Sequence, residues 1–465
     1  MLEILTLLTG VIVFVITVVG LARSRDPLFP MTILAPMLLY VYVYSPMLRL
    51  SSGSVLSLFP DPDRLVTVHV VNLLAVSAFC LGCIWHRRPP RVDNRFSVLH
   101  QQLTPRTRRR MELLAILLGC ISCGAFVYMV SYSGGWVRVF SQAKPNLISP
   151  SGYIGELPML SYPAIFVLSF AYQGRRLTVG RWLALIWVML PQLIMATLGG
   201  RRGPMFLVAC SYFATWSIIH QRRPQVRTVL VGMAILGCLM LLLQGNRGDL
   251  FRPWQADLDT TILEQLWSAP EVNAGDEYVV ACATVVTSAE YGHHYWGVRY
   301  FATFCIRPIP RFVWPTKYED FGLDWMRTDP GKSGIPTSQW LDCVGFEPAG
   351  GSAGGFVSDL FLEFSWGCIL ASFLIGMFCS AAWKRWVTHG GLWTLLYFEI
   401  MILSVYLVAQ TLGAWLYRVV LVTTLTAVFW KWTLGRKRIH QPALAQHAHR
   451  QQARDVASAS FETYR

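Results

Sequence analysis

Apolar residues occur along the chain in blocks of about 18–22 residues, separated by shorter polar segments. A block of this length crosses the ~30 Å hydrocarbon core of a bilayer as an α-helix. We therefore predict an all-α fold, a polytopic transmembrane bundle of about eleven helices. The predicted spans are residues 3–22, 28–48, 65–85, 111–131, 158–173, 182–198, 204–220, 227–244, 356–382, 392–410 and 414–433.

The polar segments predict how the chain lies across the membrane. Lys and Arg are concentrated in the loops that follow odd-numbered spans and in the C-terminal tail. Short loops rich in these residues stay on the cytoplasmic side. We expect the N-terminus outside and the C-terminus inside. The first block follows Met-Leu-Glu and has no small-residue cleavage site, so we interpret it as a retained span.

This topology divides the chain into four parts. Residues 1–244 form an N-terminal membrane bundle of about eight spans, and 245–355 form one long external loop with interfacial helices. Residues 356–433 carry about three further spans. Residues 434–465 form a cytoplasmic tail, rich in Gln, Ala and His, that we expect to be disordered. Within the loop, Val279–Phe304 is apolar enough to lie on the membrane surface or dip into it.

Composition agrees with this assignment, because 54% of the residues are hydrophobic and 14% are charged, against about a quarter charged in soluble domains. The two Cys-x-x-Cys pairs, at Cys80 and Cys120, fall inside predicted spans. No nearby His completes a metal site, so packing is the favoured interpretation. Cys282, Cys305 and Cys343 lie in the external loop, and the sequence leaves open whether two of them pair.

Basic residues on the external side are the first candidate chemistry. Arg201 and Arg202 lie between glycines, and Pro204 begins the next span directly afterwards. Free amides at a helix N-terminus favour anions, and arginines add bidentate donors. We interpret the turn as a phosphate site. The alternative is that both arginines reach lipid headgroups, which does not require the flanking glycines.

A second basic cluster lies in the rigid, Pro-rich run from Arg307 through Arg311 to Lys317. Two aromatic residues, Phe312 and Trp314, interrupt it. A solvated loop needs no such rigidity, so we predict ligand binding by these side chains, with Arg247 and Arg299 as further candidates.

His293 and His294 lie between two tyrosines and follow Glu290. Any of the three could act as the general base for a hydroxyl acceptor; the alternative is an interfacial Tyr/His girdle. Other external carboxylates remain open: Glu156, Asp249, Asp276, Glu277, Glu319 and Asp320.

Three segments resemble the oligosaccharide repeat-unit polymerases, the O-antigen polymerase (Wzy-type) family. The Gly-Gly-Arg201-Arg202-Gly turn is like that family's small-residue/Arg turn. The run from Arg307 to Lys317 is similar to its "iPR…WP.KP" signature. The segment Gly354–Gly367 resembles the family's small-residue approach to the following span.

The resemblance implies an enzyme of the bacterial inner membrane for O-antigen or exopolysaccharide biosynthesis. It would polymerise glycan units linked to undecaprenyl diphosphate on the outer face, within a fold like the multi-span C-type glycosyltransferases. The implied partners are the lipid-linked glycan as donor and acceptor, the bilayer, and a chain-length regulator protein. No nucleic acid, metal or cofactor is expected.

The expected reaction is transfer with inversion at the anomeric carbon. Arg201, Arg202 and Arg311 would stabilise the departing diphosphate, and His294 would deprotonate the acceptor. An O-antigen ligase uses the same donor with another acceptor, and the sequence does not separate the two. A glycan flippase is the alternative from another class. Transporters tend to place charges at the bilayer midplane, whereas few charges, among them Glu399 and Arg418, fall in these spans.

Overall fold

The computed structural model describes residues 1–59, 61–85, 103–141, 147–149, 152–199, 202–229, 231–232, 235, 274–309, 313–323, 333–349 and 352–434. Every element within these residues is helical, and none is a strand. The chain divides into two units, Met1–Ala427 and Val428–Arg465. All contacts described below lie within the first unit.

Nine helical stretches of the described residues are long and apolar enough to cross a membrane. The chain is therefore an all-helical protein with the spans of a multi-pass membrane protein. The nine stretches are Leu2–Ser24, Pro30–Ser51, Arg64–Ile84, Pro105–Tyr132, Ile154–Ala171, Val179–Thr197, Gly355–His389, Leu392–Ala409 and Leu412–Thr433.

Two of the eleven predicted spans are not among these nine. The seventh, at residues 204–220, coincides with the helix α10 (Arg202–His220). The eighth, at 227–244, lies largely outside the described residues. Residues 245–273 of the predicted loop and 435–465 of the predicted tail also lie outside them.

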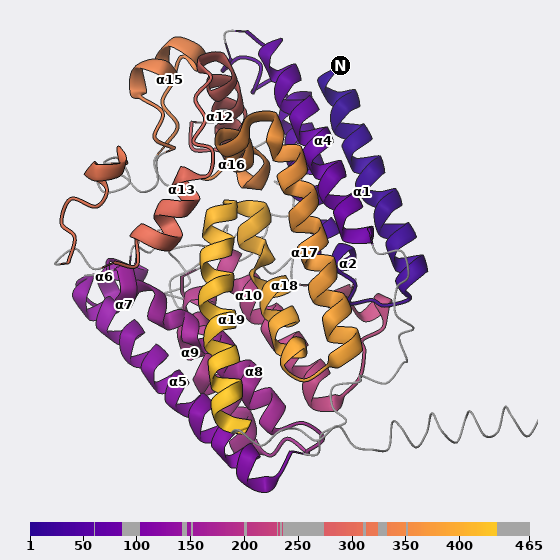
Figure 1. Cartoon of the computed structure of the whole chain (residues 1–465), viewed down its shortest axis with the longest axis vertical. Coiled ribbons are helices and arrows are strands. Elements are labelled where there is room, and N and C mark those ends of the chain that lie inside the picture. The colour runs from indigo at the N-terminus through magenta and orange to yellow at the C-terminus, as the bar shows by residue number, and fades with distance from the viewer. Residues whose placement is uncertain are drawn as a thin grey trace, which may run out of the picture. The chain divides into compact units, whose positions relative to one another are not determined.

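The spans pack in two groups (Figure 1). In the first, α4 (Arg64–Ile84) packs on α1 (Leu2–Ser24) and on α17 (Cys368–His389). The first group also contains a continuous helix made of α2 (Pro30–Leu39), the π-turn η1 (Tyr40–Tyr44) and α3 (Ser45–Ser51). The π-turn lies just before Pro46, which has no N–H to donate within the helix.

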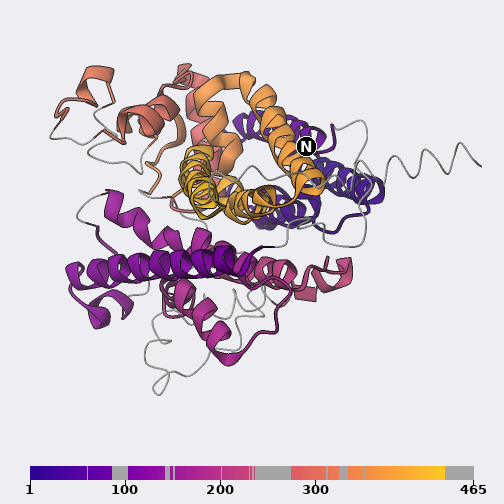
Figure 2. The ribbon, with the colours of Figure 1, turned by 60° about the horizontal axis from the view of Figure 1, so that its bottom comes forward.

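The second group consists of α5, α8, α9 and α10, which contact one another in several pairs. Figure 2 shows this group in purple and magenta below the indigo and orange helices of the first. The helix α18 contacts α17 and α2 as well as α8 and α10, and so joins the two groups. Their bounds are α5 (Pro105–Tyr132), α6 (Trp136–Phe140), α7 (Gly152–Glu156), η2 (Leu157–Leu160), α8 (Ser161–Ala171), α9 (Val179–Thr197), α18 (Leu392–Ala409) and α19 (Leu412–Leu434).

Small residues allow the close approach of α4 and α17. A Cβ atom added at Gly376 would lie 2.1 Å from the carbonyl oxygen of Phe79, and one added at Gly82 would lie 2.2 Å from that of Phe373. Membrane helices commonly approach through such glycines. Cys80 and Cys83 are buried on α4, which agrees with the packing interpretation. Cys282, Cys305 and Cys343 are free thiols.

The candidate span Gly355–His389 is not one continuous helix. The helix α16 (Gly355–Phe364) ends at Ser365, whose φ of 52° is unusual for a residue with a side chain, and η6 (Ser365–Gly367) leads into α17. At 1.5 Å per residue, α17 is about 33 Å long and crosses the hydrocarbon core by itself. The predicted span at 356–382 therefore covers two helices, the buried α16 and most of α17.

The loop helix α12 (Glu277–Tyr291) also differs from expectation. Its residues 278–288 are all buried, because it packs against α4, α15 (Thr337–Val344) and α16. A helix that is apolar on every face is buried within protein, whereas a surface helix is amphipathic. Asp276 caps its N-terminus and pairs with Arg49 of α3, with Arg49 Nε 2.9 Å from Asp276 Oδ2. These helices lie at the end of the bundle where α1 begins, which we call the loop end (Figure 1).

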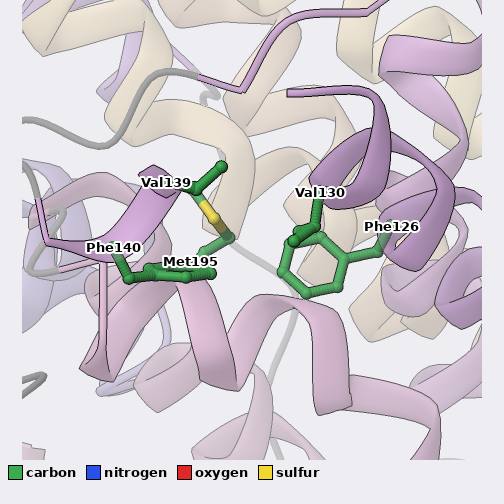
Figure 3. Packing of buried hydrophobic residues seen from close by; sticks show 5 residues of the cluster. All are labelled: Phe126, Val130, Val139, Phe140 and Met195. Atoms are coloured by element: carbon green, nitrogen blue, oxygen red, sulfur yellow. The ribbon is translucent and has the colours of Figure 1, made fainter. Parts of the chain in front are cut away.

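An apolar cluster fixes the connections around α5 and α9. Phe126 and Val130 of α5 meet Val139 and Phe140 of α6, with Met195 of α9 among them (Figure 3). All five are nearly inaccessible to solvent. Because Met195 lies in the last turn of α9, this cluster fixes the point from which the chain turns toward α10.

Candidate functional site

The two predicted histidines lie in a turn that follows α12. Gly292 ends that helix with a φ of 60°, and the His293 amide then donates to the Ser288 carbonyl. The chain continues beside the end of α16, where the Trp296 amide donates to the Glu363 carbonyl at 2.7 Å. We call residues Gly292–Gly297 the histidine turn. Main-chain hydrogen bonds at both ends hold it in place.

The hydrogen bonds of His294 define its tautomer. Its Nδ1 atom lies 3.1 Å from the Phe361 carbonyl oxygen, which can only accept. The Ser288 hydroxyl, 3.2 Å from the same atom, donates to the His293 carbonyl and so also accepts here. Nδ1 therefore carries the proton, and Nε2 keeps its lone pair. No hydrogen bond joins Nε2 to any residue that the structure describes, so this nitrogen can accept a proton.

His293 differs from its neighbour because its Nε2 atom is occupied. The Tyr295 hydroxyl lies 2.9 Å from that nitrogen, and burial raises the pKa of Tyr295 to about 12, so the phenol stays protonated. Burial, with smaller effects from His294 and Arg299, lowers the pKa of His293. Nε2 of His293 is thus engaged within the turn.

Glu290 lies on the last turn of α12, with its side chain half exposed. Its carboxylate is 3.9 Å from Arg64 Nη2, a surface separation that contributes little to stability. Of the three predicted bases, His294 therefore has the geometry best suited to accept a proton.

A buried ion cluster holds the histidine turn against α16. Arg299 pairs with Asp359, and its Nε atom is 2.8 Å from Glu363 Oε1. The other oxygen of Glu363 accepts from the Gly297 amide at 2.8 Å. Asp359 also accepts from the Tyr300 hydroxyl at 2.8 Å. Asp359 and Glu363 are 5% and 0% exposed, so these contacts form away from solvent.

The sequence reasoning missed this cluster. It named Arg299 only as a further candidate for ligand binding and treated residues 356–382 as an apolar span, without weighing Asp359 and Glu363. The available signal was their spacing of four residues in an apolar stretch, which places both carboxylates on one helix face. Carboxylates in such a stretch usually form an ion pair with a cationic side chain. The partner lies about 60 residues earlier and cannot be identified from spacing.

Arg307 and Lys317 occupy a compact segment that also involves α19. The helix α13 (Val298–Phe301) continues into the π-turn η4 (Ala302–Ile306), and Arg307 follows with its guanidinium 5.0 Å from the ring centre of Tyr417 on α19. Lys317 is 3% exposed. Its ammonium binds the carbonyls of Ile306, Arg307 and Ile309, the first two at 3.0 and 3.1 Å. Lys317 thus fixes the main chain that carries Arg307.

The side chains of the other predicted ligand-binding residues lie outside the part of the chain that the structure describes. Arg202 is the first residue of α10, and its side chain lies outside the description. Arg201, Arg247 and Arg311 also lie outside the described residues. The structure therefore brings together the histidine turn, the ion cluster and Arg307, which α13 and η4 connect.

Asp359 links this segment to the membrane spans. The Asp359 oxygen that binds Tyr300 also accepts from the Leu412 amide at 3.0 Å, where α19 begins. The base candidate therefore lies at one end of α13 and η4, and Arg307 lies at the other end beside α19. Nine helical residues separate the ends by about 14 Å. An extended ligand could contact both.

Comparison of the chain with protein-family models, curated proteins and solved structures finds no match. The functional argument therefore rests on the chemistry of the residues above.

Proposed function

We propose that the protein is a membrane glycosyltransferase, specifically a polymerase of oligosaccharide units linked to undecaprenyl diphosphate. It works on the outer face of the bacterial inner membrane, with its N-terminus outside and its C-terminus inside. The supporting observation is His294, whose Nε2 lone pair is unengaged among the described residues, in a fixed turn that α13 and η4 connect to a cationic segment beside a span. The similarity to Wzy-type polymerases supports the same proposal.

The reaction begins with a hydroxyl of the acceptor glycan. Its oxygen attacks the anomeric carbon of the donor, and its proton passes to Nε2 of His294. The new C–O bond forms as the bond from the anomeric carbon to the phosphate oxygen breaks. The electron pair leaves with undecaprenyl diphosphate, and configuration at the carbon inverts. A positioned base of this kind contributes about 10²–10⁴ in rate.

Cations stabilise the charge on the leaving group. Arg307, held by Lys317, acts here together with Arg201, Arg202 and Arg311, while Arg247 contributes at the start of the loop. The loss of one preorganised donor typically costs about 10²–10³ in rate. The length of α13 and η4, which connect the histidine turn to Arg307, suits a substrate in which a sugar and a diphosphate lie between acceptor and lipid.

Glycan ladders from cells that carry His294→Gln test the base. We expect chain growth to fall at least ~100-fold at equal protein abundance, because Gln cannot accept the proton. The matched control is His389→Gln, which changes an exposed histidine at the C-terminal end of α17. A normal ladder with His294→Gln would contradict the proposal.

Arg307→Ala and Arg202→Ala test the cations in the same assay. Ladders of normal length at normal protein levels would remove these residues from the mechanism. A ligase is distinguished by offering the purified protein one lipid-linked oligosaccharide and no other acceptor, because only a polymerase then extends chains.

A further inference from the structure

Arg418 is a charged residue inside an apolar span that the reaction above does not use. It lies six residues after the start of α19, so its Cα atom is about 9 Å into that helix. Arginines at such positions are rare, and they usually face a partner or a polar ligand. The surroundings of Arg418 therefore bear on its role.

The guanidinium of Arg418 has few polar partners. Its Cζ atom lies 4.1 Å from the ring centre of Tyr406, and Nη1 donates to the Ala414 carbonyl at 3.1 Å. Nε is buried and has no hydrogen-bond partner among the described residues. No carboxylate in the described part of the chain forms an ion pair with it. One of its five N–H donors is thus satisfied within that part.

Glu399 is a buried carboxyl group of the same helix pair, and it does not serve as the partner of Arg418. Its Oε1 atom accepts from the hydroxyl of Thr426 on α19. Thr426 lies eight residues beyond Arg418, which corresponds to about 12 Å along the helix. The pair formed by α18 and α19 therefore keeps its cation and its carboxyl apart.

Arg418 does not lie on the outer surface of the bundle, as an arginine reaching for lipid headgroups would. The ring on which it stacks, Tyr406, is 8% exposed. Tyr162 of α8 is 1% exposed, and it is close enough to Arg418 for an electrostatic interaction between the two side chains. Arg418 therefore faces the interior, between α8, α18 and α19.

Arg418 is also next to the proposed site. It follows Tyr417, on whose ring Arg307 lies. Side chains in helices point toward the N-terminus, and the bond to Ala414 places the guanidinium about 3 Å below the first residue of α19. The guanidinium groups of Arg307 and Arg418 thus both contact the first turns of α19, Arg307 at Tyr417 and Arg418 at Ala414.

We propose that Arg418 binds a phosphate group of the polyprenyl-linked substrate at the membrane side of the site, as a substrate-binding residue. This inference rests on the proposed function and adds a ligand contact from within a span. An anion there would accept from Nε, which lacks a partner among the described residues, and would balance a partly buried charge. Without ligand, that charge is a cost to the fold.

Binding of undecaprenyl phosphate to the full chain in phosphatidylcholine nanodiscs tests the proposal. We expect Arg418→Gln to weaken binding about 10- to 100-fold, the usual loss for hydrogen bonds to a charged group. Arg418→Lys should recover part of it. The matched control is Arg138→Gln, an exposed arginine of α6, which should bind normally. The same measurement is repeated with phosphatidylglycerol in place of undecaprenyl phosphate. A site for polyprenyl phosphate does not bind phosphatidylglycerol, whereas equal binding of both lipids shows a general headgroup site and contradicts the proposal.

Stability measurements separate ligand binding from a structural role. We expect Arg418→Gln without ligand to unfold at the wild-type temperature or above it, and to lose the stabilisation that the probe gives. Unchanged probe binding, or a variant that is destabilised or unfolded without ligand, overturns the proposal. Ladder formation with His294→Gln is independent of this result. If those ladders are normal while Arg418→Gln loses probe binding, the polymerase proposal fails and the phosphate site stands.

Discussion

Two buried ion clusters at opposite ends of the bundle differ in their balance of charge. At the end away from the loop, Asp26 is 0% exposed, and Arg223 Nη1 lies 2.5 Å from its Oδ2 atom. The Trp383 indole donates to the same oxygen at 2.8 Å, and the Leu28 amide donates to Oδ1 at 3.0 Å. One carboxylate and one guanidinium meet there. Their formal charges cancel without a ligand.

At the loop end, Arg299 faces both Asp359 and Glu363, so one guanidinium serves two carboxyl groups. This cluster supports the histidine turn. Arg418 is unbalanced in the opposite sense, because no carboxylate of the described chain pairs with it. We infer that the balanced cluster holds helices together, and we propose that the unbalanced groups lie where a substrate binds or reacts.

The largest expected effect tests the balanced cluster. Arg223→Met leaves Asp26 as a buried charge without its cation, and breaking such a pair costs about 3–5 kcal/mol. Unfolding of the purified protein in detergent measures this loss. The double variant Asp26→Asn with Arg223→Met should recover most of it. A loss below about 1 kcal/mol for Arg223→Met would show that the cluster does not stabilise the fold.

Lys317 tests whether a cation of the sequence signature has a structural role. Lys317→Met removes the donor shared by three carbonyls, so we expect a loss of about 1.5–3 kcal/mol in unfolding free energy. The control is Lys384→Met, an exposed lysine on α17. If Lys317→Met keeps its stability and loses only ligand affinity, Lys317 binds the ligand directly.

Glu363 tests the unbalanced cluster. Glu363→Ala leaves the Gly297 amide and Arg299 short of an acceptor, which we expect to cost about 1–3 kcal/mol. Chain growth should fall further than this loss of stability explains, because the histidine turn shifts. Glu290→Gln lies equally near the turn but is exposed, and its ladders should stay close to normal. Equal ladders from both variants would remove Glu363 from the support of His294.

Much of the helical architecture could be predicted from the sequence, because long apolar blocks have few alternatives to membrane helices. The break at Ser365 could not, because a non-glycine residue with positive φ gives no sequence signal. The burial of α12 within the protein could not be predicted from the sequence either. Its apolar stretch is compatible with either a membrane surface or a protein interior, and its packing partners are distant in the chain.

The sequence predicted which residue types form the candidate site, but not the contacts that those residues make. The sequence placed His294 near a basic segment, but the lone pair on Nε2 follows from the Phe361 carbonyl, 67 residues later. A rigid basic run likewise does not reveal whether its lysine binds phosphate or main-chain carbonyls. Lys317 binds carbonyls because the chain folds back on η4.

The smallest expected effect is a pH dependence that comes from His293. Its pKa is lowered in the folded protein by burial, His294 and Arg299, whereas in the unfolded chain it is near ~6.5. Below that pH the unfolded chain binds a proton that the folded chain resists, so stability falls as the pH falls. The change is small, because the ring is partly exposed and solvent screens its interactions. Unfolding temperatures at pH 7.5 and pH 5.5 measure it, and His293→Gln should reduce the difference between them. If the difference is the same in both proteins, the folded turn does not lower the pKa of His293, and the distinction between the two histidines has to be drawn from their partners alone.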